Sequence, residues 1–164
     1  MKRQQKKDLY KTHLFDLKKS LEWCSTVLGT SPSKTIPNVR RNNKLMFDMF
    51  EEDEDGMLSL VKELSYGAYD CENNTIYVNV NVHLDVCSLA RTFIHEYVHY
   101  LQEVCQENET TWNPKYKMKK VFTEDGMLII DSIIENEAEY NARKYYAKLL
   151  THLGYDYTYS RYTS

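Results

Sequence analysis

The stretch Thr92-Phe93-Ile94-His95-Glu96-Tyr97-Val98-His99-Tyr100-Leu101-Gln102 decides how the rest of this chain is interpreted. It contains the pattern His-Glu-x-x-His inside a run with helical periodicity. Residues four apart lie on one face of an α-helix, so His95 and His99 can direct their ring nitrogens at one metal ion. Glu96 then stands beside that ion, where its carboxylate can take a proton from water. The pattern therefore predicts a zinc site with Glu96 as general base.

The residues around this pattern separate into two faces if a helix runs from about Cys87 to Gln106. The apolar stripe is Ala90, Ile94, Val98, Leu101 and Cys105, and the polar face is Ser88, Arg91, Thr92, His95, His99, Gln102 and Gln106. The alternative is a pair of histidines that are merely surface neighbours. Because both histidines lie on the polar face, we expect them to border a cleft.

Composition frames this interpretation. The 164 residues are 42% hydrophobic, which suits one domain spanning 1–164, with a basic arm at 1–7 and a Tyr-rich tail at 154–164. The net charge of −3 argues against a nucleic-acid surface over the whole molecule. No apolar run approaches the roughly 18 residues of a membrane span, and none follows the N-terminal charges as in a signal peptide. We expect an intracellular or cytoplasmic protein, monomeric and without membrane contact.

The four cysteines are widely spaced, at Cys24, Cys71, Cys87 and Cys105. In a reducing compartment they are expected to be buried thiols. Cys105 occupies the place of the last ligand in the longer pattern His-Glu-x-x-His-x-x-Gly-x-x-His. Gln102 stands where that pattern needs a helix-breaking glycine, so the helix is predicted to continue and to carry Cys105 past the metal.

Hydrophobic patterning predicts the elements before this helix. They are a helix over 8–28 capped by Gly29, a loop over 30–44, and a hairpin of strands 45–50 and 57–61 joined by the acidic turn 51–56. The turn could instead be a calcium loop, but it lacks the ligand spacing of an EF-hand. Strict alternation then predicts a strand over 75–84, and Asp85 is predicted to cap the helix that follows. His83 is expected to be a solvent-facing strand residue, with a third metal ligand as the alternative.

A catalytic zinc needs a third protein ligand, and the last predicted helix offers carboxylates. This helix follows a polar loop over 107–120, opens at Thr123-Glu124-Asp125 and runs to about Leu150. Asp131, Glu135 and Glu139 recur every four residues on one face and repel one another unless a cation compensates. Ala138 and Ala142 flank this line and permit close approach of another helix. The alternative is a solvated acidic face balanced by Arg143 and Lys144.

At this point the chain resembles the gluzincin clan of metallopeptidases, in a compact form. The matching segments are His95-Glu96-Tyr97-Val98-His99 and Glu135-Asn136-Glu137-Ala138-Glu139, within a resemblance that covers about 75–150. It implies a zincin-like α+β fold with an N-terminal helix, a small mainly antiparallel sheet, the His-Glu-x-x-His helix and a long C-terminal helix. It also implies Zn²⁺ held by His95, His99 and Glu135, with Glu139, or else Asp131, orienting a ligand imidazole.

These observations together predict zinc-dependent hydrolysis of a peptide bond in a protein or peptide substrate, with Glu96 as general base. The substrate is expected to lie along the strand that ends near Leu84, and a tyrosine such as Tyr100 or Tyr146 could stabilise the oxyanion. One alternative is a catalytically inactive zincin-like binding or regulatory module whose cleft is covered by the Tyr-rich end. The other is a nucleic-acid-binding protein that uses a short basic cluster, composed of Lys115, Lys117, Lys119 and Lys120.

Overall fold

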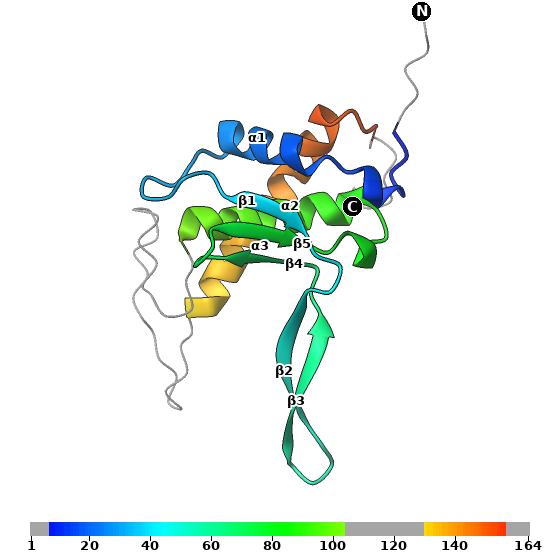
Figure 1. Cartoon of the computed structure of the whole chain (residues 1–164), viewed down its shortest axis with the longest axis vertical. Helices are drawn as coiled ribbons and strands as arrows, with labels where there is room; N and C mark the ends of the chain where they lie inside the picture. Colours follow the sequence, from blue (N-terminus) through cyan, green and yellow to red (C-terminus); the bar gives the residue numbers. More distant parts are fainter. Residues whose placement is uncertain (1–6, 104–129, 157–164) are drawn as a thin grey trace, which may run out of the picture.

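The computed structural model describes residues 7–103 and 130–156, apart from the side chains of 47–50, 60–63 and 130–133. These residues form an α+β structure of helices and small sheets, as the sequence predicts (Figure 1). In chain order the elements are η1 (Thr12–Leu14), α1 (Leu17–Val27), β1 (Asn38–Arg41), β2 (Met46–Glu52), β3 (Leu58–Leu64), β4 (Gly67–Asp70), β5 (Thr75–Val78), η2 (Val80–Val82), α2 (Val86–Gln102) and α3 (Ile130–His152).

The main sheet has three strands in the order β1-β5-β4. β5 pairs in parallel with β1 and in antiparallel with β4, so the sheet is mixed where a mainly antiparallel one was expected. Ile76 and Val78 of the central strand are fully buried. Since β5 has a partner on each side, β4 forms the edge of this sheet near α2, and none of the described strands pairs with its outer side.

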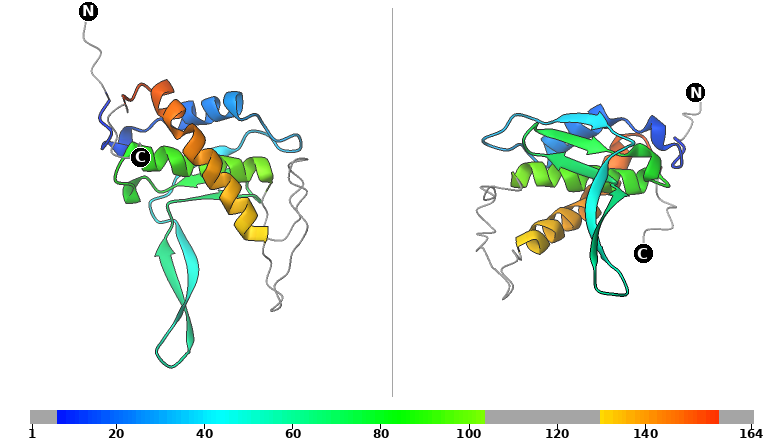
Figure 2. Two further views of the ribbon diagram at one scale, coloured as in Figure 1. Left: turned by 180° about the vertical axis from the view of Figure 1, so that it is seen from behind. Right: turned by 60° about the horizontal axis from the view of Figure 1, so that its bottom comes forward.

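Three layers stack at the centre of the molecule: the sheet, then α2, then α3 (Figures 1 and 2). α2 packs against β4 and β5, and α3 crosses α2 on the side away from the sheet. Ala138 and Ala142 of α3 are fully buried, as the close approach of two helices requires. The core of α2 includes Leu89, Phe93 and Ile94, each of which contributes about 1.5–3 kcal/mol by burial.

The first long helix is shorter than predicted. α1 begins at Leu17 because the Asp16 carboxylate accepts a hydrogen bond from the backbone N–H of Lys19, at 3.0 Å, and so caps the helix there. The end agrees with the prediction, since Gly29 follows α1 with a φ of +89°, a conformation that favours glycine.

Strand β1 lies inside the segment 30–44 that was expected to be a loop. Its Arg41 guanidinium donates to the backbone carbonyls of His13 and Phe15, each at 3.0 Å. These bonds fasten β1 to the segment before α1. The strand is therefore specified by its tertiary partners, which local sequence does not show.

The prediction of a strand over 75–84 is wrong beyond Val78. β1 pairs with β5 as far as Val78, and β4 begins opposite the same residue. Asn79 still donates its N–H to the Tyr66 carbonyl at 3.0 Å, after which the chain turns into η2. Alternation of apolar residues continues past Val78, but within residues 7–103 and 130–156 no neighbouring strand extends beyond it to hold an extended backbone there.

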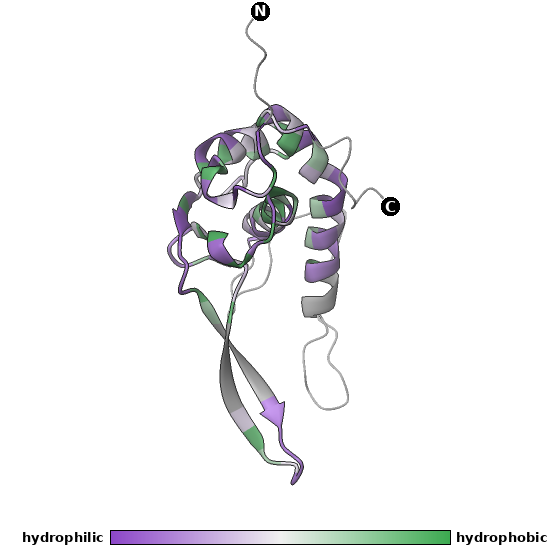
Figure 3. Cartoon of the chain, turned by 90° about the vertical axis from the view of Figure 1, so that its right-hand side faces the viewer, coloured by the Kyte–Doolittle hydropathy of each residue, from purple (hydrophilic) through white to green (hydrophobic). Residues whose placement is uncertain are grey.

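The predicted hairpin is confirmed, with longer strands than expected. β2 and β3 pair in antiparallel and project from the body of the molecule (Figures 1 and 3). At the turn, the Asp53 carboxylate accepts from the backbone N–H groups of Asp55 and Met57, at 3.0 and 2.8 Å. Gly56 has a φ of +76°. Asp53 thus stabilises a tight turn, in agreement with the turn interpretation.

The cysteines differ from the expectation of four buried thiols. Cys24 and Cys87 are buried thiols, whereas Cys71 is disulfide-bonded. Disulfides are rare where glutathione keeps thiols reduced, so the cysteines give no support to the expected reducing compartment. Among the helices described, none combines the length and the apolar character needed to cross a membrane.

Candidate metal centre

α2 begins as predicted, at Val86. The Asp85 carboxylate accepts from the Ser88 N–H at 2.9 Å and caps the helix. The expected continuation of this helix past Gln102 is wrong. Glu103 follows in a left-handed conformation, with a φ of +52°, and its carboxylate accepts hydrogen bonds from the hydroxyls of Ser31 and Ser33. Cys105, expected to be carried past the metal, lies outside the described residues.

Three side chains from α2 and α3 converge where these helices cross. Glu135 places one carboxylate oxygen 2.9 Å from His95 Nε2 and the other 3.0 Å from His99 Nε2. The two Nε2 atoms are themselves 3.0 Å apart. Within the described part of the chain, these residues are the group of His, Cys, Asp and Glu side chains whose ligand atoms gather closely enough for a metal ion.

This donor set fits zinc. Two imidazole nitrogens and one carboxylate are a common ligand set of catalytic zinc, which leaves a fourth position for water. Bonds of about 2.0–2.1 Å in a tetrahedral site hold the ligand atoms roughly 3.3 Å apart. The observed separations of 2.9 to 3.0 Å are within a few tenths of an ångström of that spacing.

Glu139 lies on the Nδ1 side of the His95 ring, where the sequence analysis expected an acid. Its carboxylate lies 3.3 Å from His95 Nδ1, and its other oxygen accepts from Arg143 Nε at 3.0 Å. Arg91 adds a second guanidinium at 3.9 Å. A partner on Nδ1 leaves Nε2 as the ring atom that faces Glu135. Asp131, the alternative for this role, has its backbone in α3, but its side chain lies outside the description.

Gln102 makes the corresponding contact to His99, and the sequence reasoning missed it. Its side chain is 2% exposed and places Oε1 2.8 Å from His99 Nδ1. Its Nε2 donates to the backbone carbonyl of Ile134 at 3.2 Å. The sequence does contain a signal for this contact, because Gln102 follows His99 by three residues and lies on the same polar face of the helix.

Glu96 points from α2 toward the sheet and is 9% exposed. Burial raises the pKa of its carboxyl, against the opposing charges of His99 and His95 and a hydrogen bond from the Tyr69 backbone. A Cβ atom added to Gly67 of β4 would lie 3.2 Å from Glu96 Cγ and 2.6 Å from Thr92 Cγ2. The carboxylate therefore lies under the open edge of β4, beside the histidines and with an enhanced affinity for a proton.

The charges of the cluster balance one another. Burial lowers the pKa of His95 and His99, but a hydrogen bond to Glu135 and the nearby Glu96 and Glu135 charges outweigh it and raise both. The pKa of Glu135 is lowered well below its usual range by hydrogen bonds from the two rings. Arg91 of α2 and Arg143 of α3 lie 3.9 and 3.0 Å from Glu139 and relieve part of the repulsion expected along the acidic face of α3.

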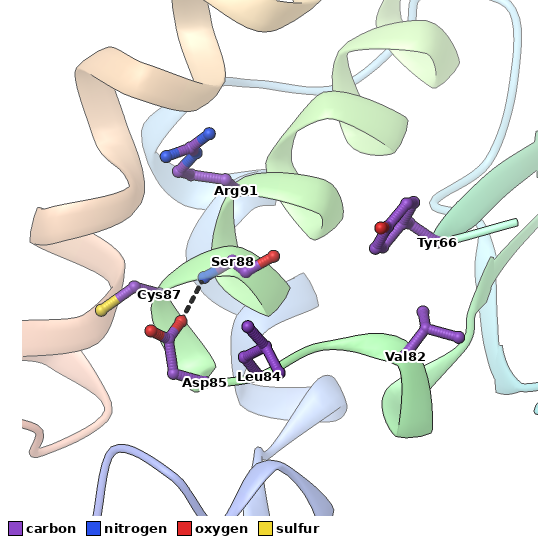
Figure 4. A pocket seen from close by; sticks show the side chains of 7 residues that line it. All are labelled: Tyr66, Val82, Leu84, Asp85, Cys87, Ser88 and Arg91. Atoms are coloured by element: carbon purple, nitrogen blue, oxygen red, sulfur yellow. Dashed lines mark hydrogen bonds between the residues drawn. The ribbon is translucent and has the colours of Figure 1, made fainter. Parts of the chain in front are cut away.

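A cleft of about 360 Å³ runs past these groups. It is lined by Ser65, Tyr66, Gly67, Ser88, Arg91, Thr92, His95, Glu96 and Glu139. A second cavity of about 220 Å³ shares Tyr66, Ser88 and Arg91 with it. Figure 4 shows Leu84 and Val82 of the segment before α2 lining this second cavity, near Tyr66. A bound molecule in the cleft therefore has an adjoining, partly apolar space beside it.

The remaining candidates from the sequence take other roles. His83 is buried, not solvent-facing, because its Nδ1 lies 2.8 Å from Ser88 Oγ and its ring packs beside Tyr66. The Tyr100 hydroxyl donates to the Lys34 carbonyl, at 3.1 Å, and is fully buried. Tyr146 lies under the Arg91 guanidinium, 5.9 Å from the ring centroid. None of these contacts places a tyrosine hydroxyl at the metal centre.

Two alternatives from the sequence depend largely on residues outside the description. The basic cluster 115–120 lies there, as does most of the Tyr-rich end, at 157–164. The described start of that end is packed, since Tyr155 is 4% exposed and donates its N–H to the Leu150 carbonyl. Lys7 of the N-terminal arm lies over the Tyr155 ring.

Searches for related proteins give no match to this chain among protein-family models, curated proteins or solved structures.

Proposed function

We propose that this protein is a zinc-dependent peptidase with a compact zincin-like fold. The observation that carries the proposal is the convergence of His95, His99 and Glu135 beside the buried Glu96. A solvated acidic face would not bring a carboxylate of α3 within 3.0 Å of both histidines of α2. The resemblance to gluzincins supports the same assignment.

Zinc held by these three residues would polarise a substrate carbonyl and acidify a water molecule. The Glu96 carboxylate accepts the proton that water gives up and returns it to the nitrogen of the leaving amine. Its raised pKa suits this exchange, because the group must both take and release a proton near neutral pH. Glu139 and Gln102 keep the two ligand rings in position from behind.

The open edge of β4 is the place for an extended substrate, in contrast to the strand near Leu84 that was first expected. Asn79 donates to the Tyr66 carbonyl, and hydrogen-bonded pairs alternate along an antiparallel ladder. The backbone groups of Gly67 and Tyr69 therefore face away from β5, toward the cleft. The backbone N–H of Tyr69 donates to the Glu96 carboxylate, which agrees with this register. The Gly67 carbonyl already accepts from Ser65 Oγ at 2.8 Å, so a peptide that accepts from the Gly67 N–H would pass over Glu96.

The test is Glu96→Gln compared with the unmodified protein, both purified without a histidine tag. The amide fills the same space but cannot accept the proton, so hydrolysis of a mixed peptide library should fall by roughly 10²- to 10⁴-fold. Metal analysis should still find about one zinc per chain in both. Glu137→Gln, a matched change on α3 outside the metal group, should keep full activity.

Two results would contradict the proposal. If the unmodified protein binds zinc but cleaves no peptide, the fold serves as a binding module. If Glu96→Gln loses zinc along with activity, Glu96 is a structural residue and the assignment of general base is wrong.

A further inference from the structure

Gln102 lies where the second ligand histidine meets the helix of the third ligand. It is the last residue of α2, and its side chain is almost fully buried. One end of the amide contacts the His99 ring, and the other contacts the backbone of α3 at Ile134, one residue before Glu135. A single side chain therefore joins the two helices that form the metal centre.

The chemistry of these contacts fixes which end of the amide faces which partner. A backbone carbonyl can only accept a hydrogen bond, so the NH₂ group of Gln102 must face Ile134. The amide oxygen is then left for His99 Nδ1 at 2.8 Å, and an amide oxygen can only accept. His99 Nδ1 must therefore carry a proton to bond this oxygen. A neutral ring that keeps the Nδ1 proton gives up the Nε2–H bond to Glu135, whose exposed carboxylate water can still solvate.

We propose that Gln102 is a positioning residue through which the backbone of α3 selects the tautomer of His99. With the proton on Nδ1, the Nε2 lone pair faces His95 and Glu135, 3.0 Å from each. The ring is then ready to bind a metal before one arrives. The inference rests on the proposed zinc site, but it does not depend on peptidase activity.

Burial explains why an amide suits this position better than the carboxylate that serves His95. Glu139 is a partly exposed acid shared with Arg143 and Arg91. Gln102 is enclosed, where an unpaired charge would carry a large desolvation cost. A neutral group with one donor and one acceptor satisfies both of its partners without that cost.

The experiment compares Gln102→Met, an apolar replacement of similar length, with the unmodified protein in two measurements. Nitrogen NMR of the zinc-free protein, at a pH where both imidazoles are neutral, should show His99 protonated at Nδ1. In Gln102→Met the ring should become a mixture of tautomers. Zinc affinity, from competition with a fluorescent chelator, should fall by about 10- to 100-fold.

Two further variants separate positioning from stability. Leu101→Ala removes the buried neighbour of Gln102, so it should lower the melting temperature yet leave the tautomer and the zinc affinity unchanged. Gln102→Glu keeps an acceptor for His99 and loses the donor to Ile134. It should keep more zinc affinity than the methionine variant but lower the melting temperature, because its carboxylate is buried beside the Ile134 carbonyl, and it serves as the test if the methionine variant does not fold.

The failures are distinguishable. If the unmodified protein does not bind zinc, the metal centre is wrong, whereas the NMR measurement still decides whether Gln102 sets the tautomer. If zinc binds and Gln102→Met changes neither measurement, or if Leu101→Ala lowers the affinity as much, Gln102 is only a packing residue. Equal losses in the methionine and glutamate variants would also overturn the inference.

Discussion

Glu135 and Glu139 lie one turn apart on α3 but contact the histidines differently. The two carboxylate oxygens of Glu135 contact Nε2 of His95 and Nε2 of His99, whereas Glu139 contacts only one of these rings, at Nδ1 of His95. Glu139→Ala should therefore lower zinc affinity by about 10- to 100-fold, the usual cost of losing a group behind a ligand. Glu135→Ala should lower it further, because it removes a ligand. A fluorescent-chelator titration measures both, with Glu137→Ala as the control.

A result in which Glu139→Ala is the more damaging variant would shift the third ligand by one turn. A result in which Glu137→Ala is as damaging as either would point to a general effect of charge on α3. Equal affinities in all variants would mean that α3 supplies no ligand.

The histidines also predict opposite pH dependences with and without zinc. In the zinc-free protein, the pKa of His95 and of His99 is raised above the ordinary 6.5. The two histidines therefore contribute to the stability of the folded protein below pH 6.5, and this contribution is lost as the pH rises through the raised pKa values. Glu135 has a lowered pKa, so it stabilises the folded protein above its ordinary pKa of 4.5, and this stabilisation is lost as the pH falls through the lowered pKa. The cluster thus stabilises the zinc-free protein most between pH 4.5 and 6.5.

Zinc reverses this trend, because it binds neutral imidazoles and competes with their protons. The stability gained on adding zinc, measured as the difference in melting temperature with zinc and with a chelator, should increase from about pH 5 to 8. Over the upper part of this range, the contribution of the zinc-free cluster should decline. A zinc effect that is independent of pH would mean that His95 and His99 are not ligands.

Sequence spacing was sufficient to predict those residues of the candidate site whose relative positions follow from the geometry of a single helix. His95 and His99 on α2, and Glu135 and Glu139 on α3, are pairs four residues apart, and such pairs share a face in any helix. The contacts of Gln102 and the burial of His83 could not be predicted in the same way. Both depend on segments distant in the chain, Ile134 for the first and Tyr66 for the second.

At the scale of elements, the contact between β4 and α2 depends on Gly67. A Cβ at this position would lie 2.6 Å from Thr92 Cγ2, closer than real Cβ contacts. Gly67→Ala should therefore push β4 away from α2, lower the melting temperature and reduce activity by displacing the strand over Glu96. Thr92→Ser removes the methyl group nearest to the clash, so the double variant should recover part of both losses.

Activity assays and thermal unfolding of the two single variants and the double variant form a double-mutant cycle. Recovery in the double variant would locate the effect at the β4–α2 contact. Additive losses would show that the two residues act independently and that the substrate edge does not depend on their approach.

Elements with long periodic patterns were predicted better than elements defined by their neighbours. α2 and the hairpin were identified from periodicity and turn residues. The end of β5 and the existence of β1 were not, because a strand extends only as far as its partners. The end of α2 was missed for a similar reason, since Ser31 and Ser33 hold Glu103 in its left-handed conformation.

At the scale of the whole molecule, the cysteines predict a specific pattern of labelling. Alkylation of the denatured, unreduced protein should modify Cys24 and Cys87, which are thiols outside any disulfide. Cys71 should react only after reduction, because it is disulfide-bonded. Peptide mapping by mass spectrometry reads each site separately. Labelling of Cys71 without reduction would restore the expectation of thiols in a reducing compartment.

The projecting hairpin has a practical consequence for studying a metal protein. Its turn, from Asp53 to Met57, is exposed and polar, and the two strands pair mainly with each other. Exposed turns of this kind are the positions where proteins best accept inserted sequence. A short affinity peptide without histidine, inserted between Glu54 and Asp55, would allow purification with both chain ends unmodified and no added zinc ligand.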